Sequence, residues 1–299
     1  CIRDRRLAAQ MPDSTRDGAI ARVLSVRGTV LFDQERFRKA ADHSSRAAAV
    51  ARKVGDESAL ADSLNTRGTA LAMLGEQGPE SEASLREALA IHERHGDLAK
   101  QSQIIGNLGG MAWFAGHWDE AGQLYRQAAE TAFRAGDVVP GALAQANLGE
   151  LLTAQGRAVE AVEVLSNAVA TLRASGYTGA SFAETQLGRA YAVLGERERA
   201  VEALESLAPS WDSDTHTDVI DLVIALAEHD VDDGRPADAL DQLDTALAGM
   251  GDVGVYAAAA QRVRARALAR LGRHAEAQAA IEVSTSQATV YGLGYKLVP

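Results

Sequence analysis

Small and apolar residues recur along this chain with a period of 38 to 41 residues. Seven positions after each small residue stands a glycine in six of seven cases, the exception being Glu35. A second pattern follows with apolar or small residues at spacings of 0, 4 and 7, as at Ala161, Leu165 and Ala168. That spacing covers one face of an α-helix, and glycine ends helices because it adopts the left-handed conformation at little cost. The pattern predicts seven helix pairs, whose small residues are Gly28, Gly68, Gly109, Gly149, Gly188, Ala227 and Ala265.

A helix pair of this length cannot cover its own apolar face. Small residues on both helices allow them to cross closely, where a bulky side chain would push them apart. Neighbouring pairs must then stack to bury the remaining apolar surface. We therefore expect an all-α fold, an α-solenoid of about seven helix-turn-helix units.

This recurring pattern of a small residue, a turn glycine and a second helix resembles the tetratricopeptide repeat (TPR). The first helix carries x-L-G, a glycine marks the turn, and Ala-x3-Leu/Tyr-x2-Ala follows, over residues 16 to 292. The period exceeds the usual 34, and Gly-Asp, as at Gly55-Asp56 and Gly96-Asp97, replaces the closing proline. The resemblance implies a right-handed superhelix. The longer helices are similar to TPR arrays in the C-terminal sensor regions of bacterial signalling ATPases and of LuxR-type and antibiotic-regulator-type activators.

The repeat register divides the chain into five parts. Residues 1–15 are interpreted as the remnant of a preceding helix or a cap, and residues 16–208 hold units 1–5. Residues 209–216 form an irregular break, because Pro209 cannot continue a helix. Residues 217–292 hold units 6 and 7, and residues 293–299 are a tail. Trp211, in the break, either marks a hinge or interaction loop or packs over a looser turn.

The sequence around unit 6 is acidic. Residues 212–233 contain eight acidic residues and no lysine or arginine, whereas the next first helix carries Arg262, Arg264, Arg266 and Arg270. Either the acidic stretch and the arginine-rich helix attract each other, or the acidic stretch docks a basic partner. The run from Asp230 to Gly234 lacks the spaced ligands of a calcium loop, so a turn is expected there.

Composition and charge narrow the classes of function. A hydrophobic fraction of 46%, a mean hydropathy of -0.13 and a net charge of -11 indicate a soluble globular chain that makes no direct contact with nucleic acid. No stretch approaches the roughly 18 apolar residues of a membrane span, so we expect a cytoplasmic protein. Cys1 is the single cysteine, which excludes an internal disulfide. Because the chain does not begin with Met, we expect a segment of a larger protein.

Motifs for catalysis are missing from the sequence. It contains no G-x-x-x-x-G-K-S/T, G-x-S-x-G or H-E-x-x-H motif, so we expect no enzyme activity, no cofactor and no metal. His92 and His95 lie three residues apart near the end of a second helix, where we expect a surface pair.

The resemblance implies that first helices line a concave binding surface. The inward positions are then -6, -3, -2, +1, +4 and +5 from each small residue, one broad helical stripe. Asn107, Asn147 and Gln186 occupy one equivalent position, where an amide ladder would suit an extended peptide backbone. The candidate groove residues are Asn65, Thr69, Gln103, Gly106, Asn107, Gly110, Trp113, Phe114, Asn147, Glu150, Gln186 and Arg189.

Two of these candidates are glycines inside a helix. Gly106 and Gly110 each cost roughly 1 kcal/mol relative to alanine, and neither stands at the crossing position. Either they open a pocket walled by Trp113 and Phe114, or Trp113 packs back over them and fills the space.

The sequence therefore predicts a non-catalytic domain that binds a protein or peptide. The resemblance implies the regulatory arm of a larger bacterial signalling or transcription-regulatory protein, with other domains of its parent as further partners. Because the solenoid ends lack evident polar caps, self-association of the chain into a homo-oligomer is also expected as possible. Two alternatives stay open: a small-molecule receptor using the pocket near Trp113, and a self-associating scaffold.

Overall fold

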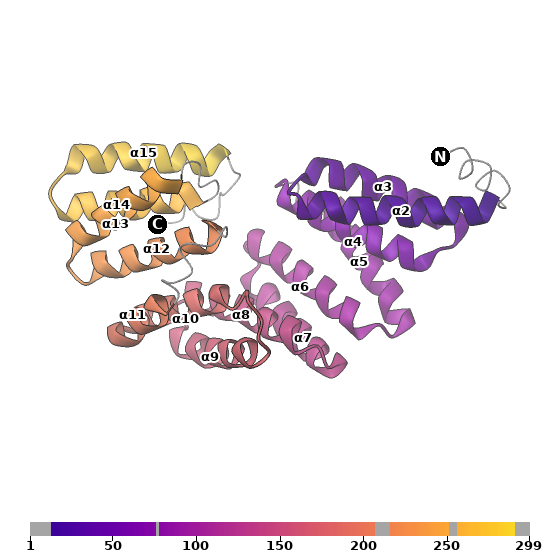
Figure 1. Cartoon of the computed structure of the whole chain (residues 1–299), viewed down its shortest axis with the longest axis horizontal. Helices are drawn as coiled ribbons and strands as arrows, with labels where there is room; N and C mark the ends of the chain where they lie inside the picture. The colour runs from indigo at the N-terminus through magenta and orange to yellow at the C-terminus, as the bar shows by residue number, and fades with distance from the viewer. Residues whose placement is uncertain (1–12, 76–77, 207–215, 251–255, 291–299) are drawn as a thin grey trace. The chain divides into compact units, whose positions relative to one another are not determined.

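The computed structural model describes residues 13–75, 78–206, 216–250 and 256–290. Every regular element in these ranges is an α-helix, as Figure 1 shows. The helices are α2 (Asp13–Asp33), α3 (Phe37–Val54), α4 (Glu57–Met73), α5 (Pro79–His95), α6 (Leu98–Phe114), α7 (Trp118–Ala135), α8 (Val138–Ala154), α9 (Ala158–Ala174), α10 (Ser181–Leu194), α11 (Arg197–Glu205), α12 (His216–Asp232), α13 (Pro236–Met250), α14 (Tyr256–Arg270) and α15 (His274–Val290).

These helices form the seven pairs that the repeat pattern predicted, from α2 with α3 to α14 with α15. The all-α helical-repeat fold is thereby confirmed. The chain divides into two compact units, residues Cys1–Gly141 and Ala142–Pro299, and each is described by itself. Trp211 and nearly all of the predicted break at 209–216 lie outside the described residues, as do the segment 1–12 and the tail.

The crossing positions are as crowded as predicted. A Cβ atom at Gly68 would lie 2.8 Å from Cγ of Leu85, and one at Gly109 would lie 2.9 Å from Cδ1 of Tyr125. Such contacts are too short for any real side chain, so glycine sets the approach of the two helices.

Turns between helices are built from a left-handed residue. Gly75 has a φ of 74°, and Glu35 takes the same conformation at 58°. At Glu35 the backbone N–H donates to Phe32 O at 2.8 Å, and the next N–H, of Arg36, donates to Leu31 O at 2.9 Å. These bonds satisfy carbonyls at the end of α2 in the manner of a Schellman motif.

We expect Glu35→Gly to raise the free energy of unfolding of the first unit by about 1 kcal/mol, because a Cβ atom disfavours the left-handed region. The midpoint of urea unfolding measures this gain. Gly75→Ala is the matched control, and it should lower stability by a similar amount because Gly75 has the same backbone conformation. A lower midpoint for Glu35→Gly would contradict the assignment.

The Gly-Asp pairs join one repeat to the next. Gly55 ends α3 with a φ of 75°, and the Asp56 carboxylate then accepts the backbone N–H of Ala59 at 3.1 Å. Asp97 caps α6 in the same way, accepting the N–H of Lys100 at 3.1 Å. Such caps satisfy N–H groups that have no partner within the helix. The two residues therefore close one helix and begin the next.

The acidic stretch pairs with the arginine-rich helix. A guanidinium N–H of Arg262 donates to Glu228 at 3.2 Å, and Arg266 pairs with Asp232. These contacts support mutual attraction of adjacent faces rather than a free acidic surface. The run from Asp230 to Gly234 is the end of α12 followed by a turn at Gly234, whose φ is 79°, as predicted.

The expectation of a surface histidine pair is wrong for His92. His92 is only 5% exposed. His95, by contrast, is exposed, and its Nε2 atom lies 2.7 Å from Oε2 of Glu57. The repeat register explains the burial, since His92 stands at the position that holds the fully buried Ala51 in α3 and Ala132 in α7. The histidine therefore lies in the interface between repeats.

We expect the first unit to lose stability as the pH falls below about 6.5, the usual pKa of histidine. Burial lowers the pKa of His92, an effect that the Asp97 carboxylate 3.7 Å from Nδ1 only partly opposes. Within the described part of the chain, Nε2 of His92 has no hydrogen-bond partner. The unfolded chain therefore binds this proton first, so stability rises with pH in this window. The midpoint of urea unfolding, measured between pH 7.5 and 5.5, should depend less on pH in His92→Gln than in the parent protein. The same pH dependence in both proteins would exclude His92 as the cause.

Candidate functional site

One pocket crosses three successive first helices in the first unit. It encloses about 290 Å³ and opens beside α2, α4 and α6. Its lining residues are Ser25, Val26, Thr29, Phe32 and Asp33 of α2, Asp62, Asn65, Thr66 and Thr69 of α4, and Lys100, Gln103 and Asn107 of α6. Because the same face of each first helix contributes, the repeat itself builds the pocket.

A hydrogen-bond cluster around Asn107 joins two of these helices. The Nδ2 group of Asn107 donates to Oδ1 of Asn65 at 3.0 Å and lies 3.2 Å from Oγ1 of Thr69, to which it also donates. The hydroxyl of Thr69 in turn donates to the backbone carbonyl of Asn65 at 2.9 Å. This arrangement fixes the orientation of both amides. The Oδ1 atom of Asn107 and the Nδ2 group of Asn65, the other halves of the two amides, take no part in these three hydrogen bonds.

The other side of the pocket is charged and hydroxylated. The Lys100 ammonium lies 3.1 Å from Oδ1 of Asp62, and both side chains are about two-fifths exposed. The hydroxyls of Thr29 and Thr66 lie 3.5 Å apart, which extends the polar contacts from α4 to α2. Because exposed ion pairs contribute little to stability, Asp62 and Lys100 can exchange partners with a ligand at small cost.

The structure brings four of the predicted groove residues together: Asn65, Thr69, Gln103 and Asn107 all line this pocket. The first two belong to α4, the others to α6. The offset rule therefore selects side chains that share one surface. The rule is what the resemblance to the TPR family implies, and it agrees with the α-helical period, which places these offsets on one broad stripe.

The other candidates on α6 do not line this pocket. Trp113 is half-buried and Phe114 is 41% exposed at the end of the helix. A Cβ atom at Gly106 would lie 3.9 Å from Ala128, and one at Gly110 would lie 3.8 Å from the hydroxyl of Tyr125. Ordinary van der Waals contact is all that alanine would meet, so helix packing does not require either glycine.

The remaining four candidates belong to the second unit. Asn147 and Glu150 are half-buried on α8, and Arg189 of α10 lies 3.8 Å from Glu228. Gln186, by contrast, is only 2% exposed. A peptide on the surface could not reach that amide without a rearrangement, which separates Gln186 from the other two members of the expected ladder.

Sequence reasoning missed the contribution of α2. Val26, Thr29 and Phe32 stand at -2, +1 and +4 from Gly28, so the same rule applied to the first repeat, the pair of α2 and α3, would have found them. Lys100 lies nine residues before Gly109, outside the rule, and the salt bridge to Asp62 draws its side chain to the rim.

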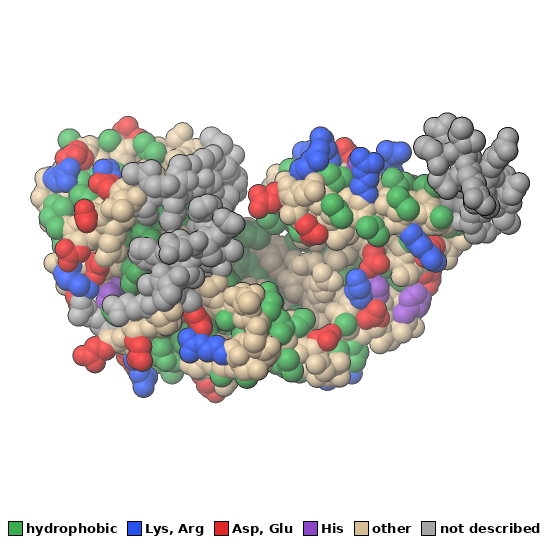
Figure 2. All heavy atoms as spheres, viewed as in Figure 1, with side chains coloured by type: hydrophobic (Ala, Val, Ile, Leu, Met, Phe, Trp, Pro, Cys, Tyr) green, Lys and Arg blue, Asp and Glu red, His purple; other side chains and the backbone are tan. Residues whose placement is uncertain are grey.

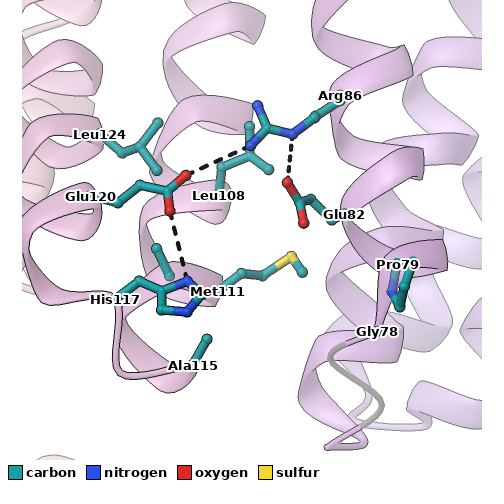
Figure 3. A pocket seen from close by; sticks show the side chains of 11 residues that line it. Gly78, Pro79, Glu82, Arg86, Leu108, Met111, Ala115, His117, Glu120 and Leu124 are labelled. Atoms are coloured by element: carbon teal, nitrogen blue, oxygen red, sulfur yellow. Dashed lines mark hydrogen bonds and ion pairs between the residues drawn. The ribbon is translucent and has the colours of Figure 1, made fainter.

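A second pocket lies among α5, α6 and α7 (Figure 3). It encloses about 260 Å³, and the apolar side chains of Leu108, Met111 and Leu124 line it. A chain of charges spans the opening: the Arg86 guanidinium lies 2.6 Å from Glu82 and 3.7 Å from Glu120, whose other oxygen lies 3.7 Å from His117. These ion pairs connect α5 to α7, so the charged groups at the opening are paired with one another.

In the described ranges, no three His, Cys, Asp or Glu side chains gather closely enough to hold a metal ion. No described helix combines the length and the apolar character that crossing a bilayer requires.

Comparison with known proteins identifies the repeat. Residues 142–166 and 258–282 match the family model of the tetratricopeptide repeat, and they fall on α8–α9 and α14–α15. No curated protein matches the chain in sequence.

Solved structures share the architecture. A Rap protein complexed with competence and sporulation factor is 18% identical, with a TM-score of 0.70 over 95% of this chain and 78% of its own. A plasmid Rap conjugation gene regulator in complex with a Phr peptide is 16% identical, with a TM-score of 0.68 over 89% of this chain and 72% of its own. Aspartyl phosphate phosphatase F from Bacillus subtilis is 14% identical, with a TM-score of 0.71 over 92% and 72%. At these identities the similarity concerns the fold.

Proposed function

We propose that this chain of tetratricopeptide repeats binds an extended peptide, or an extended segment of a protein, in the groove of α2, α4 and α6, and that it carries no catalytic activity of its own. The observation that carries the proposal is the cluster of Asn107, Asn65 and Thr69 inside a pocket built by three successive repeats.

The chemistry of the pocket suits a peptide backbone. A side-chain amide can donate and accept hydrogen bonds at once, as a peptide group does. The contacts between Asn107, Asn65 and Thr69 hold these amides in place before a ligand arrives, which reduces the entropy lost on binding. Three helices packed about 9 Å apart span about 20 Å, the length of about six residues of extended chain.

The solved neighbours support this reading. One of them was solved with a Phr peptide and another with competence and sporulation factor, on the same fold. We propose a regulatory role of this kind for the chain, as the sensor arm of a larger cytoplasmic bacterial signalling or transcription-regulatory protein.

A library of random peptides of about eight residues, displayed and selected on the purified chain, tests the proposal. We expect enriched peptides to protect amides on α2, α4 and α6 from hydrogen exchange. Failure to enrich any peptide would overturn the proposal, and so would protection confined to the second helices α3, α5 and α7.

A further inference from the structure

A basic stripe runs along the outer side of α3. Lys39, His43, Arg46 and Val50 stand at intervals of four, three and four residues, which places them on one face of the helix. Lys39 and Arg46 are exposed, and Figure 2 shows Lys and Arg side chains gathered where α3 lies. Although the chain holds 41 acidic residues against 30 basic ones, neither of the two is paired with a carboxylate of the described residues. The stripe therefore presents two cations, seven residues apart, to solvent.

Later second helices differ in charge at the same two positions. The small residue that begins the second-helix pattern is Ala40 in α3, Ser81 in α5, Ala121 in α7 and Ala161 in α9. One residue before it, α3 carries Lys39, whereas the three later helices carry Glu80, Glu120 and Glu160. Six residues after it, α3 carries Arg46, whereas α5 carries Glu87 and the other two helices carry uncharged amides. Positive charge at both positions is therefore particular to α3 among these four helices.

These two positions face the preceding repeat. Glu87 lies 2.6 Å from Arg52 of α3, and Glu120 lies 3.7 Å from Arg86 of α5. Both pairs share one register, because each arginine stands six positions further along its own helix pattern than the glutamate that it meets. A helix stacked before α3 in this register meets Lys39 and Arg46 with two side chains that are seven residues apart. Carboxylates on that helix would form the same pairs with the signs reversed.

A helix in that place would also lie against α2. In the next repeat α3 occupies the place and packs against α4, where Leu60 and Ala70 are at most 8% exposed. At the same positions α2 carries Ile20 and Val30, which are 43% and 46% exposed, and Val23 between them is 67% exposed. Figure 2 shows hydrophobic side chains spaced along α2. The surface therefore combines an aliphatic floor on α2 with a basic edge on α3.

We propose that an amphipathic helix of another protein docks on this surface, with its apolar side against α2 and with two carboxylates, seven residues apart, opposite Lys39 and Arg46. The docked helix takes the place that a preceding second helix has beside α5 and α7. Burial of the aliphatic floor supplies affinity, because exposed ion pairs contribute little. The two ion pairs select an acidic partner and speed its association.

Charge complementarity decides between this occupant and segments of the chain itself. Residues 1–12, which precede α2, carry Asp4 against three arginines and so have the wrong net charge. A second copy of the chain would present its last helix, α15. At the two positions that correspond to Arg86 and Arg52, α15 carries Glu282 and Thr289, so it supplies one carboxylate where two are required. An acidic helix from another protein matches both.

A displayed library of 18-residue helical peptides, with leucines fixed along one face and the flanking positions randomised, tests the proposal on the full chain. We expect enriched peptides to carry two acidic residues seven apart. In fluorescence polarisation, a labelled enriched peptide should lose at least about tenfold in affinity with Lys39→Glu or Arg46→Glu, because like charges then face each other. The control is Arg126→Glu, since Arg126 is exposed on the second helix α7, and it should leave affinity unchanged. Asn107→Leu should also have no effect, because the groove is a separate site.

Two further variants separate docking from attraction between net charges. Val23→Lys adds a positive charge but disrupts the aliphatic floor, so docking predicts weaker binding and simple attraction predicts tighter binding. The double variant Lys39→Glu/Arg46→Glu should bind a peptide in which lysines replace both carboxylates, and such rescue also shows that the variant folds.

Three results would overturn the proposal. The first is failure to enrich any helix, with or without self-association of the chain that Arg46→Glu abolishes. The second is enrichment of helices without paired acidic residues. The third is tighter binding of the enriched peptide to Val23→Lys than to the parent.

Discussion

Gly149→Ala is expected to destabilise the second unit by about 2 kcal/mol, although alanine is the better helix former. A Cβ atom at Gly149 would lie 2.6 Å from Cδ2 and 2.9 Å from Cδ1 of Leu165, and closer still to Cγ. Leu165 is fully buried, so it cannot turn aside, and α8 and α9 must move apart. Overpacking costs about 1–3 kcal/mol, which exceeds the gain of about 1 kcal/mol in helix propensity.

Gly110→Ala is the matched control, because Gly110 also lies inside a first helix but beside open space. Its Cβ atom would meet only the Tyr125 hydroxyl, at 3.8 Å, so this variant should gain up to about 1 kcal/mol from helix propensity alone. Urea unfolding followed by circular dichroism measures both changes, and hydrogen exchange in α8 and α9 locates the first. Equal gains in both variants would show that the crossing at Gly149 tolerates a methyl group.

Asn107→Leu is expected to weaken binding of a selected peptide at least about tenfold. Leucine has nearly the shape of asparagine but cannot donate to Asn65 or Thr69, so the two polar groups lose the partner that orients them. An unsatisfied polar group in a pocket costs about 1–3 kcal/mol, and because about 1.4 kcal/mol corresponds to tenfold in affinity, a loss near the middle of this range exceeds tenfold.

Fluorescence polarisation of a labelled peptide measures that loss. Asn167→Leu is the control, because Asn167 is an exposed asparagine on α9, a second helix in the other unit. It should bind the peptide as the parent does. If Asn107→Leu also binds normally while Asn167→Leu does not, the site lies in the second unit and the groove assignment is wrong.

Local geometry explains why much of the fold could be predicted from the sequence. A helix crossing needs a small residue and a helix end needs a left-handed one, and both demands are met by single residues such as Gly109 and Gly75. The six glycines at the turn positions therefore located the first-helix ends. Glu35 has no such signal, because only the repeat register shows that it occupies the same left-handed position.

The contents of the site were only partly predictable. The offset rule selected Asn107 for a ladder with its equivalents in later repeats, whereas its amide donates to Asn65 and Thr69 of the preceding repeat. Which neighbour a side chain contacts depends on the offset between stacked helices, a tertiary quantity that periodicity does not contain. His92 shows the same limit, because its polarity indicated the surface while its register position is buried.

The joints between repeats have a consequence for how such a chain can change in length. At each Gly-Asp pair, a glycine such as Gly55 ends one helix and the following carboxylate begins the next, so the two residues specify the joint without help from distant segments. A stretch of coding sequence that ends at such a pair would carry a complete unit with its own start and stop. Tandem duplication could therefore add a unit whose ends need no adjustment, and only the side chains facing the new neighbour would remain to be refined.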